Sequence, residues 1–205
     1  MSIISDKINS TQARRRLVDG NQRFVNDTTF HHRFHAHGCA KDVKEQSPFA
    51  VVLGCSDSRV PIETIFDQSF GDLFIIRIAG NIVAPSQMGS IEFAISKFKT
   101  ALIVVLGHSN CGAINATIDE CINKTNLSDG LYSITNRIKP SILPLLKLNL
   151  TNNELVDKAV EVNIINSVKQ LQSQSPIIKE AIKNNKLEVI AANYSLKSGA
   201  VDFLT

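Results

Sequence analysis

Two stretches of this chain are apolar without interruption, which sets them apart from the mixed segments around them. They span residues 49–54 (FAVVLG) and 101–107 (ALIVVLG). A strand with one solvent-exposed face alternates apolar and polar residues, whereas a strand covered by helices on both faces does not. The pattern therefore predicts two fully buried strands of a parallel sheet.

Amphipathic segments and further short strands alternate with these two runs. Helices are predicted at 61–67, 89–98, 112–121, 153–172 and 176–184, and strands at 73–79, 187–193 and 200–204. An irregular but helix-prone stretch with Pro140 and Pro144 precedes the last two helices. Strands that alternate with helices are typical of an α/β fold with a mostly parallel central sheet flanked by helices.

The N-terminal part of the chain differs from this alternating core. Residues 11–26 (TQARRRLVDGNQRFVN) are amphipathic despite Gly20 and predict a helix, and residues 31–38 are polar. No internal repeat or linker interrupts the rest. We therefore interpret the chain as one domain over residues 1–205, with residues 1–45 forming an N-terminal helical arm and loop.

Four histidines gather in the segment HHRFHAH, and Cys39 follows them. They are His31, His32, His35 and His37. Short histidine-rich tracts do bind metals, but this spacing is irregular and no predicted helix or strand holds the donors. We interpret the cluster as a solvated connection that packs on a partner subunit.

Composition limits the classes of partner. Of the 205 residues, 43% are hydrophobic and 20% are charged, which is ordinary for a globular domain with a substantial core. The formal net charge is only +3, and the one basic run, residues 14–16, fits a solvated helix face. No segment is apolar enough for a membrane span or a signal peptide. We therefore expect no nucleic-acid or membrane partner.

Chemistry-bearing residues follow both buried strands directly. Cys55 comes after the first run, within GCSDSRVP, and His108 and Cys111 come after the second, within GHSNCG. Ligand sites of open α/β sheets lie at the carboxyl ends of the strands. If the two strands are neighbours, two thiols and an imidazole meet there. Thiolate and imidazole donors together suit zinc, and three protein ligands leave one position open for chemistry.

Other interpretations of the cysteines are weaker. A lone cysteine at a strand end is usually a small buried hydrophobic residue. The combination of Cys55, Asp57 and Arg59 in one turn with His-x-x-Cys in the equivalent turn favours a functional site instead. No Cys-x-x-Cys occurs, which argues against a redox dithiol, and the four cysteines show no disulfide-rich spacing. A reducing cytoplasm fits this pattern best.

These motifs resemble the signature of the β-class carbonic anhydrases, C-x-D-x-R followed about fifty residues later by H-x-x-C. The similarity extends to other segments and so covers nearly the whole chain. They are residues 20–24 (GNQRF), 46–49 (QSPF), 71–77 (GDLFIIR), 79–81 (AGN), 89–94 (GSIEFA) and 194–199 (YSLKSG).

The resemblance implies zinc-dependent, reversible hydration of carbon dioxide to bicarbonate and a proton. It assigns the zinc ligands to Cys55, His108 and Cys111 and the catalytic dyad to Asp57 and Arg59. Substrate contacts fall on Gln46, the Gly112 amide and an apolar wall of Phe74, Ala79 and Phe93. It also implies a homodimer or dimer of dimers, with a cleft between two subunits and the apolar wall supplied by the partner.

The charge of this ligand set bears on the expected mechanism. Three neutral histidines, as in carbonic anhydrases of another fold, lower the pKa of zinc-bound water to about 7. Two thiolates cancel the charge of the ion, so we expect ionisation at or above that value and better activity at alkaline pH. Asp57 can accept a proton from the nucleophile while Arg59 holds the carboxylate off the metal. Family members exist in open and closed forms of this arrangement.

Departures from the family pattern leave other functions open. Phe93 stands where plant-like members have tyrosine. Val52 replaces a tryptophan of members that bind bicarbonate at a second, regulatory site, although Gly54, Arg77 and Tyr194 of that site are present.

Two other functions share this fold. A hydrolase of carbon disulfide or carbonyl sulfide uses the same ligands. A catalytically silent zinc-binding scaffold is a further alternative, but a structural zinc needs neither Asp57 nor Arg59.

Overall fold

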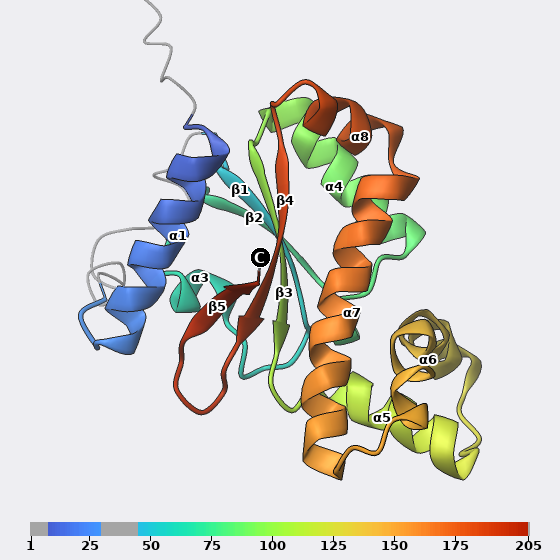
Figure 1. Cartoon of the computed structure of the whole chain (residues 1–205). Helices are drawn as coiled ribbons and strands as arrows, with labels where there is room; N and C mark the ends of the chain where they lie inside the picture. Colours follow the sequence, from blue (N-terminus) through green and yellow to red (C-terminus); the bar gives the residue numbers. More distant parts are fainter. Residues whose placement is uncertain (1–7, 30–44, 205) are drawn as a thin grey trace, which may run out of the picture.

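A five-stranded sheet forms the centre of the computed structural model, which describes residues 8–29 and 45–204 (Figure 1). In sheet order its strands are β2 (Leu73–Arg77), β1 (Ala50–Gly54), β3 (Leu102–His108), β4 (Glu188–Tyr194) and β5 (Val201–Leu204). The first four run parallel, and β5 pairs with β4 in the antiparallel sense. The predicted α/β fold with a mostly parallel central sheet is confirmed.

Helices connect the strands and cover the sheet. They are α1 (Ser10–Val25), α3 (Ile62–Ile65), α4 (Pro85–Phe98), α5 (Gly112–Asn123), α6 (Asp129–Ile142), α7 (Asn152–Gln174) and α8 (Pro176–Lys183), with 3-10 turns η3 (Ala79–Asn81) and η4 (Leu145–Lys147). Figure 1 shows α1 and α3 on one side of the sheet and α4, α7 and α8 on the other.

Two helices differ from the sequence prediction, and the residues at their ends explain why. Helix α4 begins at Pro85, four residues earlier than predicted, because proline at the first helical position has a suitable φ and needs no hydrogen-bond partner. The stretch predicted as irregular but helix-prone contains α6. Ser128 caps this helix by accepting a hydrogen bond from the Leu131 amide, and Pro140 lies in its last turn, where the break in hydrogen bonding costs least.

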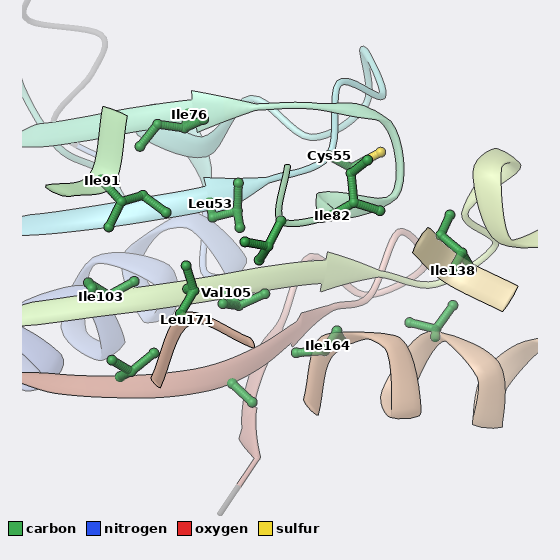
Figure 2. Packing of buried hydrophobic residues seen from close by; sticks show 14 of the residues in the cluster. Leu53, Cys55, Ile76, Ile82, Ile91, Ile103, Val105, Ile138, Ile164 and Leu171 are labelled. Carbon is green, nitrogen blue, oxygen red and sulfur yellow. The ribbon is translucent and has the colours of Figure 1, made fainter. Parts of the chain in front are cut away.

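Successive residues of the central strands bury opposite faces of the sheet. Val51 and Leu53 of β1 pack with the helices on the α4 and α7 side, while Ala50 and Val52 pack against α1 and α3. Figure 2 shows the first of these cores, in which Leu53 lies among side chains of the strands and helices. Burial on both faces explains why the strands show no polar alternation.

Helix α1 approaches α3 closely through Gly20. A Cβ atom at this position would lie 1.8 Å from the carbonyl oxygen of Phe66. The neighbouring Asn21 donates to the carbonyl oxygens of Ile65 and Gly199, at 3.2 and 2.9 Å, and accepts from the Val201 amide at 2.9 Å. Gly20 is therefore what allows the helix to dock, although it weakens the helical pattern in the sequence.

Two further expectations from the sequence concern the histidine cluster and membrane spans. The histidine cluster at residues 31–37 lies outside the described residues, as does most of the loop predicted before residue 45. Among the residues that the structure describes, no helix combines the length and the apolar character needed to cross a bilayer.

Replacing Gly20 with alanine should destabilise the fold by about 2 kcal/mol or more, because the added methyl group meets backbone rather than a movable side chain. Gly130→Ala in α6 is the matched control, since a Cβ there has no neighbouring atom within 4 Å. Its stability should be unchanged or higher by up to about 1 kcal/mol, given the better helix propensity of alanine. Urea unfolding of both variants measures the difference, and equal stabilities would contradict the docking role of Gly20.

Candidate metal centre

Parallel pairing of β1 with β3 brings the two sequence motifs to one edge of the sheet. Gly54 is in register with Leu106, so Cys55 and His108 follow at the carboxyl ends of neighbouring strands. Cys111 then lies at the N-cap of α5, after a turn in which Asn110 adopts φ 55°. The expected adjacency of the two strands is confirmed.

The three proposed ligands form a compact and buried donor set. Cys55, His108 and Cys111 are 4%, 0% and 1% exposed, and one donor atom of each lies within 4.8 Å of the other two. The two Sγ atoms are 4.0 Å apart. Thiolates bound about 2.3 Å from a tetrahedral zinc ion lie about 3.8 Å from each other, so the spacing fits this ion and is far longer than a disulfide.

The imidazole of His108 is oriented as in a metal ligand. Its Nδ1 is 2.9 Å from the carbonyl oxygen of Ser109, which fixes Nδ1 as the protonated nitrogen and leaves a lone pair on Nε2. Nε2 is buried and has no hydrogen-bond partner among the described residues. A buried, unsatisfied acceptor costs free energy unless something binds it. The donor chemistry of the site therefore fits a metal ion.

The sulfur atoms perturb each other. The hydrogen bond with the Cys111 thiol lowers the pKa of Cys55 despite burial, and the Gly80 amide also donates to Cys55 Sγ, at 3.4 Å. The same sulfur–sulfur hydrogen bond, together with burial, raises the pKa of Cys111. The amides of α5 lower it, as expected at a helix N-terminus, but they are outweighed within this pair of thiols.

Asp57 and Arg59 form a two-point ion pair beside the donor set. Arg59 Nε and Nη2 donate to Asp57 Oδ1 and Oδ2 at 3.0 and 2.8 Å, and the Arg59 amide donates to Oδ1 at 3.0 Å. The side-chain hydrogen bond holds the pKa of Asp57 well below its usual range. Asp57 Oδ2 lies 3.9 Å from His108 Nε2. An ionised carboxylate thus borders the centre without belonging to the donor set.

Polar side chains that the sequence analysis did not assign to the centre support its loops. Arg77 donates to the carbonyl oxygens of Cys55 and Asp57. From α7, Asn163 donates to Gly80 O at 2.8 Å and Ser167 donates to Asn81 O at 3.1 Å. Asn163 and Ser167 are polar residues one turn apart on the buried face of a helix, which is the signal that could have found them.

The predicted substrate contacts fall into two groups. Gly112 begins α5 next to Cys111, and Ala79 precedes Gly80 in η3, so both lie at the centre. Gln46 precedes β1 and lies at the opposite, amino end of the sheet.

The aromatic residues of the predicted wall gather away from the strand ends. Phe74 pairs with Val51 in the amino half of β2, and Phe93 on α4 lies 6.2 Å from it, measured between ring centroids. The structure thus brings the proposed ligands and the dyad together but places Gln46, Phe74 and Phe93 elsewhere in the same chain. Their role in binding substrate stays a prediction.

Comparisons with known proteins identify the family of this chain. The family described as carbonic anhydrase matches residues 50–201. A carbonic anhydrase of Mycolicibacterium smegmatis is 37% identical over 95% of this chain and 93% of its own length. Carbonic anhydrase 2 of Mycobacterium tuberculosis is 36% identical over 93% of this chain and 91% of its own length.

Solved structures give the same result. A β-carbonic anhydrase of Aspergillus fumigatus superposes with a TM-score of 0.74 at 26% identity, covering 84% of this chain and 86% of that chain. One from Sordaria macrospora, described as tetrameric, has a TM-score of 0.74 at 25% identity and covers 94% and 97%. The fold and the Cys-His-Cys centre thus define an enzyme of the carbonic anhydrase family. The chain belongs to this family, and its structural neighbours are of the β class.

Loss of one donor should empty the centre. We expect the wild-type chain to hold about one zinc ion, and Cys111→Ser, which removes a thiolate from the buried set, to lose most of it. Cys121→Ser is the control, because that cysteine lies outside the donor group. Elemental analysis of both variants gives the result. Full zinc retention by Cys111→Ser would remove the site as described.

Proposed function

We propose that this chain catalyses the reversible hydration of carbon dioxide to bicarbonate and a proton, using Zn²⁺ held by Cys55, His108 and Cys111. The observation that carries the proposal is the ionised Asp57 carboxylate 3.9 Å from the buried Nε2 of His108. A purely structural metal site has no use for such a group. The family match supports the same reaction.

The donor set favours zinc and a reactive site. Two thiolates and one imidazole suit a borderline cation, and a zinc ion held by these three residues would keep a coordination position for water. Zinc supplies a Lewis acid that makes hydroxide available as a nucleophile near neutral pH. Because two thiolates reduce that acidity, we expect hydration to be faster on the alkaline side of neutrality.

Asp57 acts on the nucleophile. Its carboxylate accepts a hydrogen bond from the attacking water or hydroxide and directs the oxygen lone pair toward the carbon of carbon dioxide. Arg59 binds both carboxylate oxygens, which keeps Asp57 anionic and holds it beside the donors. We assign the Gly112 amide, at the N-terminus of α5, a stabilising role for the negative charge of the product, because the N-terminal end of a helix favours anions.

A second copy of the chain completes the cleft in this proposal. Phe93 is 50% exposed and packs with Phe74 and Phe98 on the surface of its own subunit. Of these three rings only that of Phe93 is exposed, and aromatic residues are enriched at protein interfaces. We therefore propose a homodimer or dimer of dimers, in which Gln46 and the phenylalanines of one subunit face the metal centre of the other. A tetrameric relative supports this assembly. We place the enzyme in the cytoplasm, where the thiols stay reduced.

Asp57→Asn separates an enzyme from a zinc scaffold. The amide keeps the shape of the carboxylate but cannot accept a proton in the same way, so kcat for hydration should fall on the order of 10²-fold or more. Zinc content should remain about one ion per chain. Stopped-flow hydration assays at two pH values measure the rate. Asp19→Asn is the control, because it makes the same change at an exposed side chain. An unchanged rate would exclude Asp57 from the mechanism, and hydrolysis of carbon disulfide without hydration of carbon dioxide would contradict the proposed substrate.

A further inference from the structure

Arg77, the last residue of β2, binds the loop that carries both Cys55 and Asp57. Its Nε donates to the carbonyl oxygen of Cys55 at 2.9 Å, and its Nη2 donates to the carbonyl oxygen of Asp57 at 2.6 Å. Both contacts involve backbone acceptors, so Arg77 leaves the Cys55 sulfur and the Asp57 carboxylate available for other partners.

The topology of the sheet explains why the loop needs this support. Gly54, the last residue of β1, pairs with Arg77, and the Ile78 amide donates to Gly54 O at 3.0 Å. Beyond Gly54 the chain leaves the sheet, so its carbonyl groups lose the neighbouring strand as a partner. Arg77 projects from the next strand at this point and binds two carbonyl groups that are two residues apart.

The guanidinium group is suited to this task. It is planar, and its N–H groups point in fixed directions, so two bonds from one group fix the relative orientation of the two carbonyls. The Val60 amide also donates to Asp57 O, at 3.0 Å, which anchors the far end of the turn. The backbone between Cys55 and Asp57 is thus held at both ends.

We propose that Arg77 is a positioning residue of the metal centre. By bridging the carbonyl oxygens of Cys55 and Asp57, it keeps the Cys55 sulfur at the distance from Cys111 and His108 that metal binding needs, and it sets the Asp57 carboxylate beside them. Arg59 and Arg77 have different roles. Arg59 binds the carboxylate of Asp57, whereas Arg77 binds the backbone of Cys55 and Asp57. This inference rests on the proposed function of the same site.

Variants at position 77 separate the bridge from the charge. Arg77→Lys keeps the positive charge but cannot donate in the two fixed directions of the guanidinium group, and Arg77→Gln removes the charge as well. Arg16→Gln is the matched control, since it removes an arginine that pairs with Asp72, at 2.7 Å, away from the metal centre. Thermal unfolding of all three variants reports any general loss of stability.

The decisive readout is the rate at which the zinc-loaded chain releases its metal to excess 4-(2-pyridylazo)resorcinol. Both Arg77 variants should release zinc about 10-fold faster or more, as is typical when a partner behind a metal ligand is removed. Their kcat for hydration should fall by about 10- to 100-fold while KM stays within about 2-fold, because Arg77 does not contact substrate. Arg16→Gln should match the wild type in both measurements.

The outcomes are distinguishable. If Arg77→Lys releases zinc and hydrates carbon dioxide at wild-type rates, the bridging role is overturned, because a positive charge alone would then suffice. Wild-type values in both variants would show that Arg77 has no role in positioning the metal centre. If Arg77→Gln does not fold, Arg77→Lys decides. A wild-type chain that binds zinc but does not hydrate carbon dioxide would contradict the proposed function, whereas faster zinc release in the variants would still support the positioning role.

Discussion

The parallel pairing of β1 with β3 is the constraint on which the centre depends. With Gly54 in register with Leu106, the chain leaves both strands at the same edge, and Cys55 meets His108. A slip of one residue would turn every side chain of a strand to the opposite face of the sheet. Such a slip in β1 would exchange the residues that fill the two cores, because Val51 and Leu53 pack in one and Ala50 and Val52 pack in the other. The hydrophobic cores therefore set the geometry of the metal donors.

At the strand ends, backbone carbonyl groups need hydrogen-bond donors, and polar side chains supply them. Arg77 acts on the Cys55 loop, while Asn163 and Ser167 act on η3, where Gly80, at φ 69°, directs its amide at the Cys55 sulfur. The Asp57 carboxylate is likewise held in place by a polar side chain, that of Arg59.

The pKa of Asp57 is lowered in the folded chain by the hydrogen bond with Arg59. The stability linked to its ionisation is thus fully present above the pKa of an unfolded aspartate and is lost progressively as the pH falls from there through the lower, folded value.

Much of this arrangement was predictable because it depends on local pattern. Uninterrupted apolar runs mark buried parallel strands, and a donor directly after such a run must lie at the sheet edge, which located Cys55 and His108. Contacts set by topology were not predictable. Arg77 reaches Cys55 across 22 residues and Asn163 reaches Gly80 across 83, and no spacing within either segment encodes these pairs. Helix α6 was anticipated only as an irregular, helix-prone stretch because of its prolines, although Ser128 offered a capping signal.

Dependence of hydration on zinc tests the central claim most directly. The wild-type chain would be stripped of metal with dipicolinate, and zinc would then be added back in steps while stopped-flow hydration of carbon dioxide is followed. The account predicts that the stripped chain does no better than buffer and that the rate rises in proportion to added zinc, levelling at about one ion per chain. Full activity without metal, or a chain that binds one zinc ion and remains inactive, would contradict it.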